Sequence, residues 1–191
     1  MQANFRNFIV PLQIERDLQG EGHSGKVTAI TKDNSGNLYT CGEDCQVIVW
    51  SLAEVKRINA FAVGNEKPHS ITYLAHSNNL VIGARQIQVY SVDSQELVQT
   101  FNGHTSEVSL MSSVLMTSHG VEYAVTASRM ERVICLWKIG RKGRNVQAAC
   151  TLIMEDIAHC LSCQMDENDN IKVASVTRSG VIHVYLISVK Q

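Results

Sequence analysis

Short runs of β-branched and aromatic residues recur along the chain, separated by segments rich in glycine, asparagine, aspartate and serine. Four of these runs carry an aromatic residue near their end: QVIVWSL with Trp50, QIQVYSV with Tyr90, RVICLWKI with Trp137 and GVIHVYLI with Tyr185. The four aromatic residues follow one another at intervals of 40, 47 and 48 positions. No longer segment has apolar residues at the spacing of a helix. The pattern predicts an all-β chain built from a repeated unit.

The first unit shows the pattern most clearly. Its apolar runs predict three strands followed by an outer strand, at Val27–Thr31, Leu38–Cys41, Gln46–Trp50 and about residues 55–62. The segment DNSG at residues 33–36 separates the first two strands, and its residue types favour a tight turn. A second marker, a Gly-His pair, precedes the first and third units at His23 and His104. A unit of roughly 40–45 residues with these markers resembles the WD repeat, which forms the blades of a β-propeller.

The first unit also contains the residues of the hydrogen-bonded tetrad that WD repeats use. The imidazole of His23 is expected to donate to the carboxylate of Asp44, which precedes Trp50 by six residues. Thr40 lies between the imidazole and the indole N–H of Trp50. A half-buried carboxylate needs hydrogen-bond donors, and these side chains provide them. We interpret the four residues as a structural tetrad rather than as an acid–base pair.

The later units depart from this pattern. In the third unit Glu131 stands in place of the aspartate, while His104 and Trp137 are kept. The second and fourth units have tyrosine at the aromatic position and no aspartate in the turn; the residues are Tyr90 with Ala84, and Tyr185 with Ser179. We therefore expect the later blades to be degenerate and less rigid than the first.

The units divide residues 1–191 into one WD-repeat region. We expect an outer strand of a preceding blade and a linker at 1–21, blades at 22–62, 63–101 and 102–154, and a partial blade at 155–191. A closed ring of four blades is possible in principle, but WD-repeat rings commonly have about seven. The expected fold is therefore an all-β, WD40-type propeller segment of about four blades, incomplete and open, from a fragment or short isoform of a longer chain.

Several segments, in order, resemble one family. GHSGKVTAI, GNLYTCGEDCQVIVWSL, QELVQTFNGHTSEVSLM and SGVIHVY are similar to the WD repeat-containing protein 43 family, and the likeness runs from about residue 22 to 189. The family carries further blades and a helical C-terminal region that this chain lacks. The resemblance implies a nucleolar protein of the small-subunit processome, with other processome proteins as partners and a role in pre-rRNA transcription and processing.

Composition narrows the possible functions. The chain has 45% hydrophobic and 18% charged residues with a net charge of −1, so no overall field attracts nucleic acid or membrane. Residues 1–21 lack the pattern of a secretory signal, and no apolar run is long enough for a membrane span. With six cysteines lying mostly in strand-like runs, these features favour a reducing, intracellular compartment and free thiols.

No motif indicates catalysis, a metal or a cofactor. Cys160 and Cys163, preceded by His159, have the spacing of half a zinc site. Residues three apart on a strand point to opposite faces, and no second half-site accompanies them. Neither a nucleophile elbow nor a phosphate-binding loop occurs. We expect no enzyme activity, no cofactor and no small-molecule substrate.

Arginines recur where we expect the turns between the second and third strands of successive blades. Arg85, Arg129 and Arg178 would form an arc on one rim, and Arg141, Lys142 and Arg144 form a second basic group. One interpretation is a candidate interaction rim that binds pre-rRNA phosphates or acidic partner segments, because arginine offers forked donors. The other is a solvated rim without a ligand.

Two functions therefore remain open. The first is a non-enzymatic, nucleolar scaffold in ribosome biogenesis. The second is a general WD40 adaptor, such as a ubiquitin-ligase receptor or a trafficking subunit, with no connection to RNA.

Overall fold

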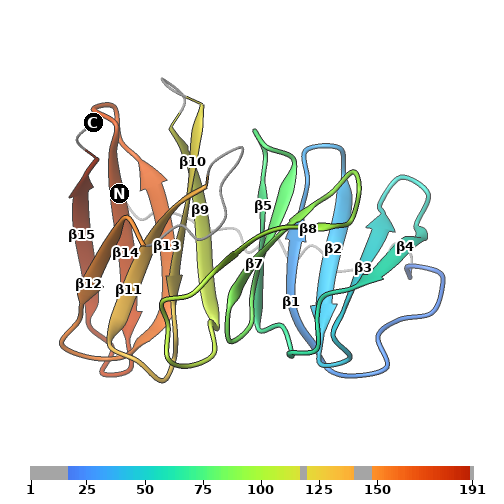
Figure 1. Ribbon diagram of the computed structural model, residues 1–191, viewed down its shortest axis with the longest axis horizontal. Helices are drawn as coiled ribbons and strands as arrows, with labels where there is room; N and C mark the ends of the chain where they lie inside the picture. The colour runs from blue at the N-terminus through green and yellow to red at the C-terminus, as the bar shows by residue number, and fades with distance from the viewer. Residues whose placement is uncertain (1–16, 117–119, 140–147, 190–191) are drawn as a thin grey trace, which may run out of the picture.

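The computed structural model describes residues 17–116, 120–139 and 148–189, which form fifteen strands and no helix. The strands make four antiparallel sheets that stand side by side in a row (Figure 1). Within each sheet the strands are hydrogen-bonded in the order in which they occur in the chain. The expected all-β fold, an open arrangement of about four blades, is confirmed. The described part has no helix that could span a membrane.

The strands have the following bounds. The first sheet contains β1 (Val27–Lys32), β2 (Asn37–Gly42), β3 (Gln46–Ser51) and β4 (Lys56–Ala62). The second contains β5 (Ser70–Leu74), β6 (Asn79–Gly83), β7 (Ile87–Ser91) and β8 (Leu97–Phe101). The third contains β9 (Leu110–Met116), β10 (Val121–Ala127), β11 (Val133–Ile139) and β12 (Cys150–Ile153). The fourth contains β13 (Ala158–Met165), β14 (Asn170–Thr177) and β15 (Ile182–Ser188).

Local sequence chemistry explains the strand boundaries of the first sheet, each of which lies within one residue of the prediction. Asp33 caps the turn between β1 and β2, because its carboxylate accepts the backbone N–H groups of Ser35 and Asn37 at 2.8 Å each. The hydroxyl of Tyr39 donates to the same carboxylate at 3.0 Å. Val55 has a positive φ of 55°, so it belongs to the turn and β4 begins one residue later than predicted.

Apolar side chains fill the space between each pair of neighbouring sheets, which gives three cores in a row. Each core joins one face of a sheet to the facing side of the next; members include Tyr39 with Ile82, Phe101 with Trp137, and Val125 with Val173. The two rings of the second pair lie 5.5 Å apart between centroids. Each sheet is therefore covered by its neighbours in the row, as expected for antiparallel sheets packed face to face.

Hydrogen bonds also cross from sheet to sheet near the inner strands. The hydroxyl of Thr28 donates to the carbonyl of Pro68 at 2.7 Å, and that of Ser70 donates to the carbonyl of Val108 at 2.8 Å. Gly83 lies at the second of these joints, where a Cβ would stand 2.7 Å from the Val108 carbonyl oxygen. The absence of a side chain at this position lets β6 approach the loop of the neighbouring sheet.

The two ends of the row differ. Beside the first sheet, the backbone of Gln19 runs parallel to β4, donating to the carbonyl of Val55 at 2.9 Å and accepting from the N–H of Arg57 at 2.7 Å. The fourth sheet has only three strands within the described residues, in line with the expected partial blade. Residues 1–16, which hold most of the outer strand expected at 9–18, lie outside the described part of the chain.

Replacing Gly83 by alanine tests the joint between the second and third sheets. We expect Gly83→Ala to lower the free energy of unfolding by about 1–3 kcal/mol, because the new methyl group overlaps a backbone carbonyl. Urea denaturation would measure the change. Gly22→Ala is the matched control, since a Cβ at Gly22 meets nothing within 4 Å. Equal stability of the two variants would contradict the interpretation.

Candidate functional site

The four residues of the first tetrad form one chain of hydrogen bonds. The Nδ1 atom of His23 lies 2.9 and 3.0 Å from the two carboxylate oxygens of Asp44. Its Nε2 atom lies 2.9 Å from the hydroxyl of Thr40. The indole N–H of Trp50 donates to that same hydroxyl at 2.9 Å. The tetrad thus links the loop before β1 to β2, to the turn between β2 and β3, and to the end of β3.

Donor chemistry fixes the direction of these hydrogen bonds. An indole N–H can only donate, so the Thr40 oxygen accepts from Trp50 and its own O–H donates to His23 Nε2, which leaves Nδ1–H for Asp44. Burial on its own would raise the pKa of Asp44, but hydrogen bonds from His23 and Ser24 outweigh it and hold the pKa below its usual value. The side chains of His23 and Asp44 are 2% and 8% exposed, which suits a structural connection.

The third sheet contains a second complete tetrad, so the expectation that this blade is degenerate is wrong. His104 Nδ1 lies 2.8 Å from Glu131 Oε2, and its Nε2 lies 2.8 Å from the hydroxyl of Thr126. Trp137 donates its indole N–H to the same hydroxyl at 2.7 Å. Burial would raise the pKa of Glu131, but hydrogen bonds from Thr105 and His104 hold it below its usual value.

Sequence reasoning missed Thr126, although a signal for it exists. Thr126 precedes Trp137 by eleven residues, whereas Thr40 precedes Trp50 by ten, because the turn in the third sheet is longer. The longer glutamate side chain spans the wider turn and still reaches the imidazole. Spacing alone therefore fails by one position.

The second and fourth sheets have no such tetrad among the described residues. In the second, the Tyr90 hydroxyl donates to the side-chain oxygen of Gln88 at 3.3 Å, within the same strand. In the fourth, Asp156 lies in the loop before β13, and its carboxylate accepts the backbone N–H of Ser179 in the turn at 3.0 Å. The carboxylate has moved from the turn to the loop, so loop and turn are still joined.

The geometry of the cysteines agrees with the structural interpretation. Cys160 is exposed, whereas Cys163 is partly buried with its Sγ atom 3.2 Å from the hydroxyl of Ser112 on β9. The two thiols therefore serve different faces of β13. Burial raises the pKa of the Cys163 thiol. Within the described residues no group of His, Cys, Asp or Glu side chains is arranged to hold a metal ion.

Three of the predicted basic residues lie in equivalent turns. Arg85, Arg129 and Arg178 are all exposed, in the turns β6–β7, β10–β11 and β14–β15. These turns lie at the same end of their sheets, the lower end in Figure 1. The backbone of Arg129 donates to the Ser109 hydroxyl at 3.0 Å and that of Arg178 to the carbonyl of Ile157 at 3.0 Å. The turns are therefore anchored while the guanidinium groups face solvent.

The first sheet breaks this series. Its turn carries Glu43, which pairs with Lys67 at 3.4 Å. In contrast, no carboxylate of the described residues forms an ion pair with Arg85, Arg129 or Arg178. The second basic group, Arg141, Lys142 and Arg144, lies outside the described residues.

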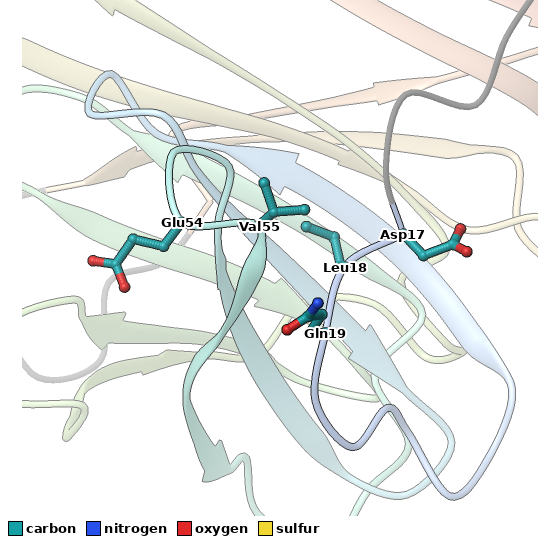
Figure 2. A pocket seen from close by; sticks show the side chains of 5 residues that line it. All are labelled: Asp17, Leu18, Gln19, Glu54 and Val55. Carbon is teal, nitrogen blue, oxygen red and sulfur yellow. The ribbon is translucent and has the colours of Figure 1, made fainter.

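A surface hollow lies where residues 17–19 pass along β4. Figure 2 shows that the carboxylates of Asp17 and Glu54 point away from each other at its two sides, with Leu18, Gln19 and Val55 between them. The two carboxylates do not converge on a shared ligand position. The hollow is a consequence of the chain covering the edge of the first sheet, which protects that edge from pairing with other strands.

Comparisons with known proteins agree with the repeat. Residues 16–51 match the family model described as WD domain, G-beta repeat. The chain is 21% identical over 185 residues to human WD repeat-containing protein 43, covering 91% of this chain and 27% of that protein. It is 30% identical over 115 residues to WD and tetratricopeptide repeats protein 1 of mouse and of human, covering 57% of this chain and 17% of each relative.

The chain therefore carries a WD40 repeat and spans between about a sixth and a quarter of the length of these relatives. WD40 repeats are generally non-enzymatic scaffolds that mediate protein–protein interaction. The turns and loops that the tetrads hold in place form the candidate surface for such interactions.

The lowered pKa of Asp44 predicts how stability depends on pH. Ionised Asp44 contributes stability that is present above its unfolded pKa of about 4 and is lost as the pH falls through the lower folded value. We expect Asp44→Asn to lower the free energy of unfolding at neutral pH by about 1–3 kcal/mol and to flatten its decline in acid. Urea denaturation at pH 7, 5 and 3 would measure both effects.

A control separates the tetrad from general acid effects. Glu66→Gln removes an exposed carboxylate and should leave both the stability and its decline in acid unchanged. If Asp44→Asn retained the full decline seen in the unmodified chain, the stabilising role of the ionised tetrad would be refuted.

Proposed function

We propose that this protein is a non-enzymatic WD-repeat scaffold in ribosome biogenesis. It acts in the nucleolus with other proteins of the small-subunit processome and supports pre-rRNA transcription and the processing of small-subunit rRNA. The observation that carries this proposal is the similarity to human WD repeat-containing protein 43, which extends over 91% of the chain. The family resemblance, rather than any catalytic group, provides the cellular context.

The exposed arginines support a direct contact with RNA. Arg85, Arg129 and Arg178 stand on three successive sheets, at one end of the row, and have no carboxylate partner among the described residues. A guanidinium group binds phosphate through paired N–H donors, and phosphate contacts position a protein on nucleic acid without reading its sequence. We infer that these residues, the arginine rim, contact pre-rRNA phosphates.

The rigidity of the turns contributes to this role. Because the backbones of Arg129 and Arg178 are tied to Ser109 and Ile157, less backbone freedom is lost when their side chains bind. Preorganisation of this kind strengthens binding without adding contacts. Acidic protein segments would meet the same donors, so they are the competing ligand that an experiment must separate from RNA.

A second candidate function has its own support. The similarity to WD and tetratricopeptide repeats protein 1 over 57% of the chain favours a general protein-interaction adaptor. Locating the endogenous protein distinguishes the two candidates. Recovery of the protein with pre-rRNA from nucleoli favours ribosome biogenesis, whereas cytoplasmic co-purification with ligase or coat subunits favours the adaptor.

Replacing the arginine rim tests the contact with RNA. We expect the Arg85→Ala/Arg129→Ala/Arg178→Ala variant to bind single-stranded pre-rRNA fragments at least about tenfold more weakly than the unmodified chain at low salt. The slope of log affinity against log salt should fall by about two, since each phosphate contact on a single strand contributes about 0.7. Fluorescence anisotropy across a salt series would measure both quantities.

A charge-matched variant serves as the control. Lys32→Ala/Lys56→Ala/Lys172→Ala removes the same number of cations from the other end of the sheets and should keep the slope of the unmodified chain. Equal affinities and slopes for all three proteins would rule out the rim as an RNA contact. Loss of binding to polyglutamate but not to RNA would assign it to acidic protein segments.

A further inference from the structure

The outer edge of β15 is an unprotected strand edge. Ile182, Val184 and Leu186 are 68%, 67% and 60% exposed, and the strand contains neither a charged residue nor proline. Proteins commonly protect edge strands with charges, proline, bulges or covering segments. Within the described residues β15 has none of these, in contrast to β4, which Gln19 covers.

The backbone groups at this edge can be assigned. The carbonyl of Val181 accepts the N–H of Thr177, so Val181 directs its backbone groups toward β14. Because these groups alternate along an antiparallel strand, the N–H and C=O groups of residues 182, 184 and 186 point away from β14. The exposed apolar residues are therefore also those whose backbone groups are ready to pair with another strand.

The other three sheets indicate what binds at such an edge. In each of them a fourth, antiparallel strand places a large apolar residue opposite the first apolar residue of the third strand; the pairs are Val47 with Phe61, Ile87 with Phe101, and Ile134 with Leu152. Ile182 occupies the equivalent position in the fourth sheet, because it pairs with Val176 as Val47 pairs with Cys41. A fourth strand in this sheet would place phenylalanine or leucine opposite Ile182.

A cleft lies beside the same edge. It is lined by Tyr123, Leu136 and Lys138 of the third sheet, by the start of β12, and by Ile187 and Val189 at the end of β15. The third sheet has a fourth strand where the last sheet has none, so the cleft occupies the space that a strand beside β15 would use. Lys138 is the charged residue of its lining, which favours an acidic residue in the ligand.

We propose that an extended segment of a partner protein binds in this cleft as the fourth strand of the last sheet. It runs antiparallel to β15, with phenylalanine or leucine opposite Ile182 and an acidic residue near Lys138, toward its own N-terminus. The segment at β8 has this pattern, since Glu96 precedes Phe101 by five residues. Main-chain hydrogen bonds provide affinity in this mode of recognition, and alternate side chains provide specificity.

The geometry favours a single strand over a second copy of the chain. Pairing two β15 strands antiparallel would put both third sheets on one face of the joined sheet, where β12 of each copy would meet the third sheet of the other. The segment that begins the described chain lies beside β4, at the opposite end of the row (Figure 1). A strand from a partner meets neither obstacle.

Binding of a defined peptide to the full 191-residue chain tests the proposal. The probe is a labelled synthetic peptide with the sequence of residues 94–102, SQELVQTFN, followed by fluorescence anisotropy. We expect binding that Val184→Pro weakens at least about tenfold, because proline removes an N–H at the free edge and leaves the bonds to β14. Ile182→Lys should weaken binding similarly, as should replacing the phenylalanine of the peptide by aspartate.

Matched controls and alternative occupants complete the experiment. Ile30→Lys changes an exposed apolar residue, 59% exposed, in the first sheet and should leave binding unchanged. Hydrogen exchange should show the amides of residues 182, 184 and 186 becoming protected when peptide is added. Neither β15 variant should alter RNA affinity, so the outcome is independent of the arginine rim.

Three results would overturn the proposal. The first is peptide binding that neither β15 variant weakens, or no binding by the unmodified chain. The second is a dimer in analytical ultracentrifugation that Val184→Pro dissociates, which would make a second copy the occupant. The third is a rise in peptide affinity after deletion of residues 1–16, which would identify the chain's own first segment as the occupant.

Discussion

The packing of one sheet on the next is the constraint on which the rest of this structure depends. A twisted sheet of three or four short strands cannot bury both of its faces by itself. Here the apolar residues of each internal face, such as Tyr39, Phe101 and Val125, lie in cores shared by two sheets. Joints such as Ser70 to Val108 then fix how the inner strands of neighbouring sheets meet. Blade and neighbour are therefore one structural unit.

The tetrads connect that packing to the surface that other molecules can reach. His23 and His104 each tie a loop to the turn between the second and third strands, through Asp44 in one sheet and Glu131 in the other. Those turns lie at the end of the sheets that also carries the exposed arginines. A side-chain network that stabilises the fold thus also limits the motion of the surface proposed to bind RNA.

Much of the fold and part of the site could be predicted from the sequence, for physical reasons that differ between elements. The strands of the first sheet follow from alternating apolar residues and a DNSG turn, and its tetrad from a fixed distance between Asp44 and Trp50. The tetrad of the third sheet escaped notice because Glu131 is longer and its turn is wider, which shifts Thr126 by one position. The transfer of the carboxylate to Asp156 in the fourth sheet is a tertiary relation, which no local spacing reveals. The role of Gly83 likewise depends on a loop of another sheet.

The open row described here gives the molecule two ends, and an end behaves differently from the middle. In a stack where each layer touches only its neighbours, stability is close to a sum of layer and interface contributions, as in repeat proteins. An interior layer is held from both sides, whereas the layer formed by β13, β14 and β15 is held from one. Fraying should therefore begin at that layer and advance inward. Anything that clasps β15 would slow the loss of every layer behind it, so a contact at the end of the row would govern the lifetime of the whole stack.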